Sequence, residues 1–146
     1  MSAPLLARHQ CEFLDLILVE CPACHGRAEV RRSSEPGKRR LTCTACFHAR
    51  NILPRDKGIT TYPPTANICN GHPLWLEAET RLGKFYAFNF EHLDHIAAYV
   101  AAPLRRVDFG PVTFRNSSVS SRLPLWVKVA KNRGEVLKII DRLRRK

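Results

Sequence analysis

The sequence predicts an α+β protein, in which a small antiparallel sheet near the N-terminus is followed by a β-hairpin and then by helices. Two Cys-x-x-Cys pairs flank a segment that alternates like a hairpin, between residues 21 and 46. A second alternating segment, broken by a turn, runs from residue 74 to 90. Apolar residues then recur at helical spacing over 91–102 and 132–144. We expect two domains, residues 1–57 and 58–146.

The first hairpin is predicted from residues 27–32 and 38–43, which read as two short strands. Between them lies Ser33-Ser34-Glu35-Pro36-Gly37, a turn signal because Pro and Gly both interrupt regular structure. The 18 residues between the cysteine pairs therefore suffice for a strand, a turn and a returning strand.

The two cysteine pairs predict a metal site. Their spacing, Cys-x₂-Cys-x₁₈-Cys-x₂-Cys, is typical of four thiolates around one zinc ion. Such a site has no open coordination position, so we expect a single structural Zn²⁺. The expected ligands are Cys21, Cys24, Cys43 and Cys46.

A redox function is the alternative for a Cys-x-x-Cys pair. It needs a helix that starts at the first cysteine, and the Gly26 that follows Cys24 together with the strand-like 28–31 argues against one. A histidine ligand, His25 or His48, in place of one thiolate would indicate a catalytic site. The four well-spaced cysteines already supply a full set of ligands, so no histidine ligand is expected. Cys11 and Cys69 lie outside the pattern and are expected to be small buried hydrophobes.

This arrangement resembles the zinc-ribbon superfamily, over about residues 12–55. The resemblance implies a zinc-ribbon domain over 1–57, with flanking strands at 12–20 and 48–53. It also implies glycine after the second cysteine of each pair, where this chain has His25 and Phe47. Most of the chain, including the segment "SSRLPLWVKVAKNR", is similar to a group of bacterial zinc-ribbon proteins of like length that have no established activity.

The second half begins with a linker-like stretch, residues 57–71. A hairpin is expected next, with strands near 74–79 and 84–90 and a turn at 80–83. A helix follows from 91 to 102, with Asn89 as a candidate cap and an apolar stripe of Leu93, Ile96, Ala97 and Val100. His92 and His95 are one helical turn apart, yet a solvated first turn is the expectation rather than a metal or catalytic pair.

Two helices are predicted at the C-terminus. Ser121 would cap the first, at 123–131, and Asn132 with Glu135 forms a capping-box-like start for the second, which ends near Arg144. The buried stripe of the second helix is expected to be Val136, Leu137, Ile140 and Leu143, with Lys138, Arg142, Arg145 and Lys146 outside.

The formal net charge of +11 predicts a polyanionic partner, and nucleic acid (DNA or RNA) is the leading candidate. The charge gathers in residues 21–57 and 105–146. Binding is expected to be independent of base sequence or to depend on the structure of the nucleic acid, because no base-reading motif is present. The expected contacts lie at the hairpin tip and in the basic C-terminal segment, where Trp126 could stack on a base or pack in the core: Arg31, Arg32, Lys38, Arg39, Arg40, Trp126, Lys128, Lys131 and Arg133.

A protein-interaction module that docks an acidic partner is the alternative function. We expect no enzymatic activity, because the sequence shows no nucleophile–base pair, no phosphate-binding glycine loop and no open metal site. No small-molecule substrate is evident. No apolar run is long enough to cross a membrane, so a cytoplasmic protein is expected.

Overall fold

The computed structural model describes residues 5–6, 8, 10–35, 38–52, 72–102, 107–108, 119 and 123–146. The protein is α+β, and it divides into two compact units. The sheet unit comprises residues 14–77 and 86–89, and the helical unit comprises residues 1–13, 78–85 and 90–146. The boundary expected at residue 57 lies outside the described residues.

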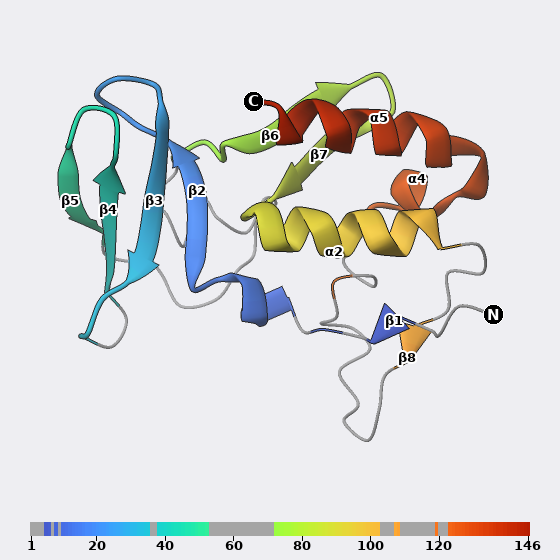
Figure 1. Ribbon diagram of the computed structural model, residues 1–146, viewed down its shortest axis with the longest axis horizontal. Coiled ribbons are helices and arrows are strands. Elements are labelled where there is room, and N and C mark those ends of the chain that lie inside the picture. The colour runs from blue at the N-terminus through green and yellow to red at the C-terminus, as the bar shows by residue number, and fades with distance from the viewer. Residues whose placement is uncertain are drawn as a thin grey trace. The chain divides into compact units, whose positions relative to one another are not determined.

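The sheet unit is built on a four-stranded antiparallel sheet with the strand order β2-β3-β4-β5 (Figure 1). Its strands are β2 (Leu16–Glu20), β3 (Arg27–Arg32), β4 (Arg39–Cys43) and β5 (Ala49–Ile52). The predicted hairpin is confirmed, because β3 pairs with β4 in antiparallel register from Ala28 opposite Cys43 to Arg32 opposite Arg39.

One face of this sheet forms the core of the unit. The register places Ile17 opposite Val30 and Val30 opposite Leu41, and all three side chains are fully buried. Val19 and Ala28 form a second buried pair on the same face. The alternation of β3 thus buries every second side chain and turns the intervening ones, such as Arg31, outward.

The strand expected at 12–20 is shorter than predicted. Residues Gln10–Phe13 form a 3₁₀ turn (η1), and β2 begins only at Leu16. Phe13 is buried, and its ring stacks on His92 with centroids 4.9 Å apart, so the turn serves to bury an aromatic side chain. Nearby in the sequence, β1 (Leu5–Leu6) pairs in parallel with β8 (Val107–Asp108).

The second hairpin is confirmed as β6 (Leu76–Thr80) and β7 (Gly83–Ala87). In its turn, Thr80 Oγ1 accepts hydrogen bonds from the backbone N–H groups of Leu82 and Gly83, both at 3.1 Å. Gly83 has a φ of 144°. A Cβ atom at this position would lie 2.7 Å from Nε1 of Trp126, so the turn requires glycine for two reasons.

The helical unit contains α2 (Phe90–Ala101) and α5 (Arg133–Arg144), which pack against each other (Figure 1). The segment predicted as one helix at 123–131 is instead α4 (Leu125–Lys128), followed by the 3₁₀ turn η2 (Ala130–Asn132). No helix in the described part of the chain is long and apolar enough to cross a membrane.

The buried stripe of α2 is as predicted, and that of α5 differs at one position. Ile139 is buried, whereas Leu137 is only partly covered. The other three predicted residues of α5 are buried, because positions three and four apart share a helical face. Lys138, Arg142, Arg145 and Lys146 are exposed, as predicted.

The predicted capping box of α5 is wrong. Asn132 makes no side-chain cap hydrogen bond. Its Nδ2 donates instead to the backbone O of Trp126, at 2.9 Å, and so ties η2 to α4. The candidate cap of α2, Asn89, donates from Nδ2 to the backbone O of Leu16, at 2.7 Å. Ser121, the other predicted cap, lies outside the described residues.

The expectation of a solvated first turn is wrong for His92, which is buried. Burial, followed by the charges of His95 and Arg8, lowers the pKa of His92 to about 3. The side chain is therefore a neutral core histidine stacked on Phe13. His95 is half-buried and lies 5.6 Å from the same ring.

Candidate functional site

The four predicted cysteines meet at one end of the four-stranded sheet. Cys21 and Cys43 stand at the ends of β2 and β4, and Cys24 and Cys46 lie in the turns that follow. All four sulfur atoms lie within 4.8 Å of one another. The sulfur atoms of Cys21 and Cys46 are 3.7 Å apart, and those of Cys24 and Cys43 are 3.6 Å apart. A tetrahedron with sulfur at 2.3 Å from a central ion has edges of about 3.8 Å, so the geometry fits one ion.

The two turns are built alike. In the first, the backbone N–H of His25 donates to the O of Cys21 at 2.9 Å, and in the second that of Phe47 donates to the O of Cys43 at 3.0 Å. The backbone N–H groups of Ala23 and Gly26 point at the sulfur atoms of Cys21 and Cys24, both at 3.4 Å. Such N–H donors stabilise thiolates, which are the form that binds a metal.

The residue after the second cysteine adopts the left-handed conformation in both turns. His25 and Phe47 each have a φ of 62°. The second turn therefore forms the same structure as the first without glycine, although a bulky aromatic residue rarely occupies this region. Phe47 is also 84% exposed, so no packing within the described residues compensates for its conformation.

The electrostatics of the cluster favour a bound cation. The backbone N–H of Cys46 is the main cause that lowers the pKa of Cys43, to about 6. The backbone N–H of His48 acts to lower the pKa of Cys46, but burial and the neighbouring thiols outweigh it and raise this pKa to about 12. Four thiolates at this distance repel one another, and their attraction to a metal cation bound among them would outweigh that repulsion.

Among the described residues, these four cysteines form the one cluster of three or more potential ligands. It contains no histidine, and His25 Nδ1 lies 2.8 Å from Glu20 Oε1 instead. The site can therefore hold a metal ion through sulfur alone. Cys69 lies outside the described residues.

The predicted cations of the first hairpin all have a partner within the sheet unit. Arg31 pairs with Glu29 at 3.2 Å, Arg32 with Asp15 at 2.9 Å, and Lys38 with Glu35. The remaining two predicted cations bond to neutral oxygens: Arg40 to Asn51 Oδ1 at 3.0 Å, and Arg39 to Leu14 O at 2.5 Å.

Arg39 differs from its neighbours because it is buried. The β4 alternation turns its side chain to the core face, opposite Ile52, while Arg40 faces outward. Its guanidinium therefore supports the fold from inside and is not available to a partner. The other four hairpin cations are exposed.

The predicted C-terminal contact residues differ in how exposed their side chains are. Lys128 and Arg133 are partly covered, and Arg133 Nη2 donates to the backbone O of Ala102 at 3.4 Å. Lys131 is exposed and has no ion-pair partner among the described residues. Trp126 is half-buried, and its ring meets Phe85 edge-on at 6.4 Å. The Trp126 side chain is thus partly packed against Phe85 and partly accessible to solvent.

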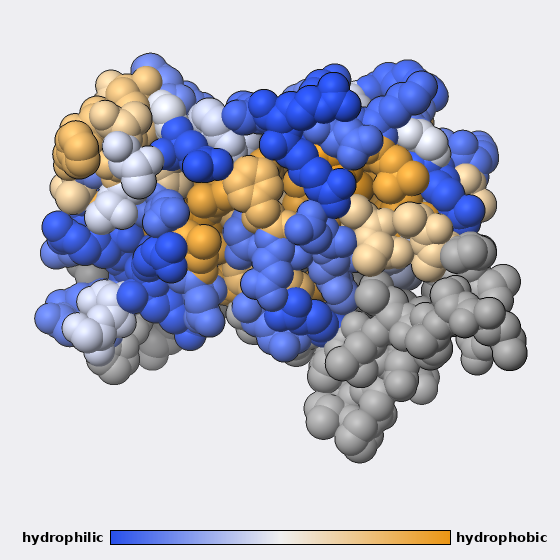
Figure 2. Space-filling view, viewed as in Figure 1, coloured by the Kyte–Doolittle hydropathy of each residue, from blue (hydrophilic) through white to orange (hydrophobic). Residues whose placement is uncertain are grey.

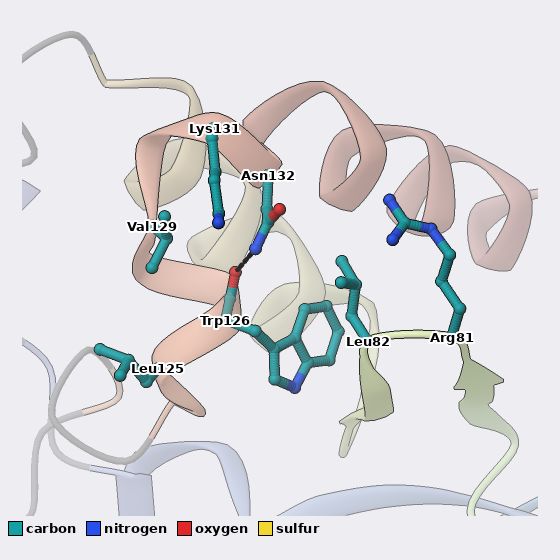
Figure 3. Close-up of a pocket in the computed structure, with 7 residues that line it drawn as sticks. All are labelled: Arg81, Leu82, Leu125, Trp126, Val129, Lys131 and Asn132. Atoms are coloured by element: carbon teal, nitrogen blue, oxygen red, sulfur yellow. Dashed lines mark hydrogen bonds between the residues drawn. The ribbon is translucent and has the colours of Figure 1, made fainter.

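Trp126 lines an open hollow of about 760 Å³ within the helical unit (Figure 3). Its walls come from the β6–β7 turn, α4 and η2: Arg81, Leu82, Leu125, Trp126, Val129, Lys131 and Asn132. In Figure 3 the indole ring lies beside Leu82, and the Lys131 and Asn132 side chains extend from the turn before α5 toward the Trp126 backbone. The lining holds two cations and no carboxylate.

A second, smaller hollow of about 470 Å³ adjoins the first, and the two share Arg81. Lys138 and Arg142 of α5 line it, together with Glu79 and Glu135. Arg81 pairs with Glu135 at 2.5 Å. Lys138 and Arg142 were predicted to lie on the exposed face of this helix but were not among the predicted contact residues, although their i, i+4 spacing indicates that they are neighbours on that face. Arg81 is distant from α5 in the sequence, so no local pattern could have predicted that it lies against this helix.

Exposed cations continue along the outer face of α5. Lys138, Arg142 and the C-cap residue Arg145 follow i, i+4, i+7 spacing, so they lie on one face, and Lys131 lies in η2, two residues before the helix. Figure 2 shows hydrophilic side chains gathered over α5. None of these four cations has an ion-pair partner among the described residues.

Comparison of the chain with models of protein families, with curated proteins and with solved structures finds no match. The assignment of the site therefore rests on the positions of the side chains themselves.

Proposed function

We propose that the protein is a zinc-stabilised nucleic-acid-binding protein without enzymatic activity, which binds the phosphate backbone independently of base sequence. The observation that carries the proposal is the row of exposed cations at α5 that lack an ion-pair partner among the described residues: Lys131, Lys138, Arg142 and Arg145.

Zinc is the metal that best fits the cysteine cluster. Four sulfur ligands in a tetrahedron are typical of structural zinc or of iron–sulfur centres, and zinc is the usual ion for two Cys-x-x-Cys turns at the end of a small sheet. We infer that β2–β5 with the two turns is a zinc ribbon. All four positions would be filled by protein, so the ion would stabilise the fold and offer no position to a substrate.

The distribution of charge supports a nucleic-acid partner for the helical unit. That unit holds 15 Lys and Arg against 7 Asp and Glu, a formal charge of +8. The sheet unit holds 9 against 6, or +3, which four thiolates and one Zn²⁺ would reduce to about +1. An excess this uneven attracts polyanions mainly to one unit.

The hairpin of the sheet unit is a weaker candidate for contact with phosphate. Its exposed arginines and Lys38 are each engaged by a side chain of the same unit. Exposed ion pairs are worth at most about 1 kcal/mol, so a phosphate could displace them, but each displacement has a cost that the free cations of α5 do not incur.

The test is binding of the metal-loaded protein to single-stranded DNA, duplex DNA and RNA of equal length over a salt series. We expect binding in the micromolar range or tighter at physiological salt, with log K falling linearly against log[salt]. Contact with four phosphates gives a slope of about −3 on a single strand. An affinity that does not change with salt would contradict phosphate contact.

A second candidate function, docking of an acidic protein, is favoured by Phe47. This ring is 84% exposed on a rigid metal turn and adopts a conformation that costs free energy. Exposed aromatic side chains on rigid elements often anchor protein interfaces, and the exposed Arg40 of β4 and Arg50 of β5 would complement an acidic rim. Absence of nucleic-acid binding at low salt, with capture of an acidic protein lost in Phe47→Ala, would favour this function instead.

A further inference from the structure

We propose that the Trp126 hollow binds one unpaired nucleotide, so that the protein prefers single-stranded nucleic acid to duplex. The inference rests on the proposed function and adds the site and the strand type. Its occupant would place a base on the indole of Trp126 and a phosphate at Lys131, which has no ion-pair partner among the described residues.

The lining of the hollow combines apolar surface with positive charge. Leu82, Leu125 and Val129 provide apolar surface around the indole, and Leu125 is 76% exposed. Arg81 and Lys131 are the charged groups of the lining; Arg81 is paired with Glu135 at 2.5 Å, whereas Lys131 has no ion-pair partner among the described residues. An aromatic ring with an apolar surround and one unpaired cation matches a base with its phosphate. The adjoining hollow, which contains Glu79 and Glu135, lacks this complementarity.

The indole of Trp126 is held in place. One edge of Trp126 rests on Gly83, where a Cβ atom would come within 2.7 Å of Nε1, and the ring meets Phe85 edge-on. Its backbone O is bonded to Asn132. A ring fixed in this way loses little conformational entropy when a base stacks on it.

The hollow adjoins the row of cations at α5 and shares Arg81 with the hollow lined by Lys138 and Arg142. A strand whose phosphates follow that row can place one base in the hollow, provided that the base is not paired. Paired bases in a duplex are stacked and turned inward, so their faces cannot reach an indole. The expected preference is therefore for single strands.

The experiment uses the fluorescence of Trp126 in the full-length, metal-loaded Trp75→Phe variant, in which Trp126 is the one remaining tryptophan. We expect a single-stranded oligonucleotide to quench the emission with the same midpoint as an independent binding assay, and a duplex of equal length to bind more weakly with little quenching. Binding without quenching, or equal quenching by duplex, would overturn the inference while the proposed function stands. No binding of any nucleic acid would overturn both.

Three variants complete the test. Trp126→Ala should weaken single-strand binding roughly 5- to 150-fold, as expected for the loss of one base-stacking contact. Trp126→Phe keeps an aromatic ring against Phe85 and should weaken binding much less, which guards against a simple folding defect. Lys131→Gln, at an exposed position, should reduce the salt slope by about 0.7, whereas Lys38→Gln on the sheet unit should not. Wild-type affinity in Trp126→Ala would contradict a base in the hollow.

Discussion

The side chain of Phe47 shows how a single residue can carry an energetic cost that its surroundings do not explain. Its φ of 62° is the conformation that glycine adopts most readily, and its ring is 84% exposed. For most residues the left-handed region costs about 1–2 kcal/mol. A costly conformation at an exposed aromatic residue is a sign of function rather than of stability.

Phe47→Gly should therefore be at least as stable as the wild type, and more stable than Phe47→Ala by about 1 kcal/mol. Both variants remove the same ring, so their difference isolates the backbone conformation. Urea unfolding of the metal-loaded proteins measures it. Equal stability of the two variants would show that the turn relaxes around alanine.

The four cysteines provide the second prediction at this scale. Cys43→Ser or Cys46→Ser should abolish tight binding of one metal ion per chain and destabilise the sheet unit, since a thiolate is lost from a closed site. Metal analysis after dialysis and the absorption of the cobalt-substituted protein measure the loss. Cys69→Ser is the matched control and should retain the ion. Full metal content in both ligand variants would refute the site.

In strand β4, two neighbouring arginines have different roles, because one supports the fold from inside and the other lies on the surface. Arg39 is buried and donates to Leu14 O, whereas Arg40 faces outward toward Asn51. Strand alternation predicts opposite faces, but the sequence does not show which face is the core until the register with β3 and β5 is known. The sequence therefore predicted the hairpin correctly and grouped Arg39 with the surface cations.

Arg39→Ala should lower the free energy of unfolding by about 2–3 kcal/mol, because it removes a charged hydrogen bond and leaves the carbonyl of Leu14 without this donor. Arg40→Ala should change stability by less than about 0.5 kcal/mol. Chemical denaturation of the two variants gives the comparison. Equal effects would mean that burial of Arg39 contributes nothing.

Helix α2 leads to a pH prediction. The folded protein holds the pKa of His92 at about 3, below the unfolded value of about 6.5, because burial disfavours the charged ring. The unfolded chain then binds more protons, so the contribution of His92 is fully present above pH 6.5 and is lost progressively as pH falls toward 3. His95 shares the direction of shift, since burial also lowers its pKa.

His92→Leu should therefore lose less stability than the wild type between pH 7 and pH 5, by about 1–2 kcal/mol. The leucine keeps an apolar contact with Phe13 and cannot be protonated. Thermal unfolding at a fixed metal concentration, as a function of pH, tests the difference. Parallel pH profiles would show that His92 does not titrate on unfolding.

The sequence also predicted the second hairpin, α2 and most of α5, because their signals are local: alternation, a turn at Thr80–Gly83 and apolar residues three and four apart. The metal cluster was predictable for the same reason, since two short spacings place the ligands. What could not be predicted depends on distant packing. His92 is buried by Phe13, and Asn132 bonds to Trp126 rather than capping α5.

At the scale of the whole molecule, charge and metal are distributed over different units. The metal cluster belongs to the sheet unit, and the larger excess of positive charge belongs to the helical unit. In this account the metal stabilises one unit and the other makes the main contact with nucleic acid. Removal of the metal should therefore affect stability more than it affects the phosphate contacts of α5.

Two charge variants, compared over a salt series with a single-stranded oligonucleotide, distinguish phosphate contact at α5 from phosphate contact at the hairpin. One replaces Lys131, Lys138, Arg142 and Arg145 with Gln, and the other replaces Arg31, Arg32, Lys38 and Arg40 with Gln. Both remove four positive charges from exposed positions. The account predicts that the first loses about 3 from the slope of log K against log[salt] and that the second keeps most of the wild-type slope. The opposite pattern, or equal losses, would contradict it.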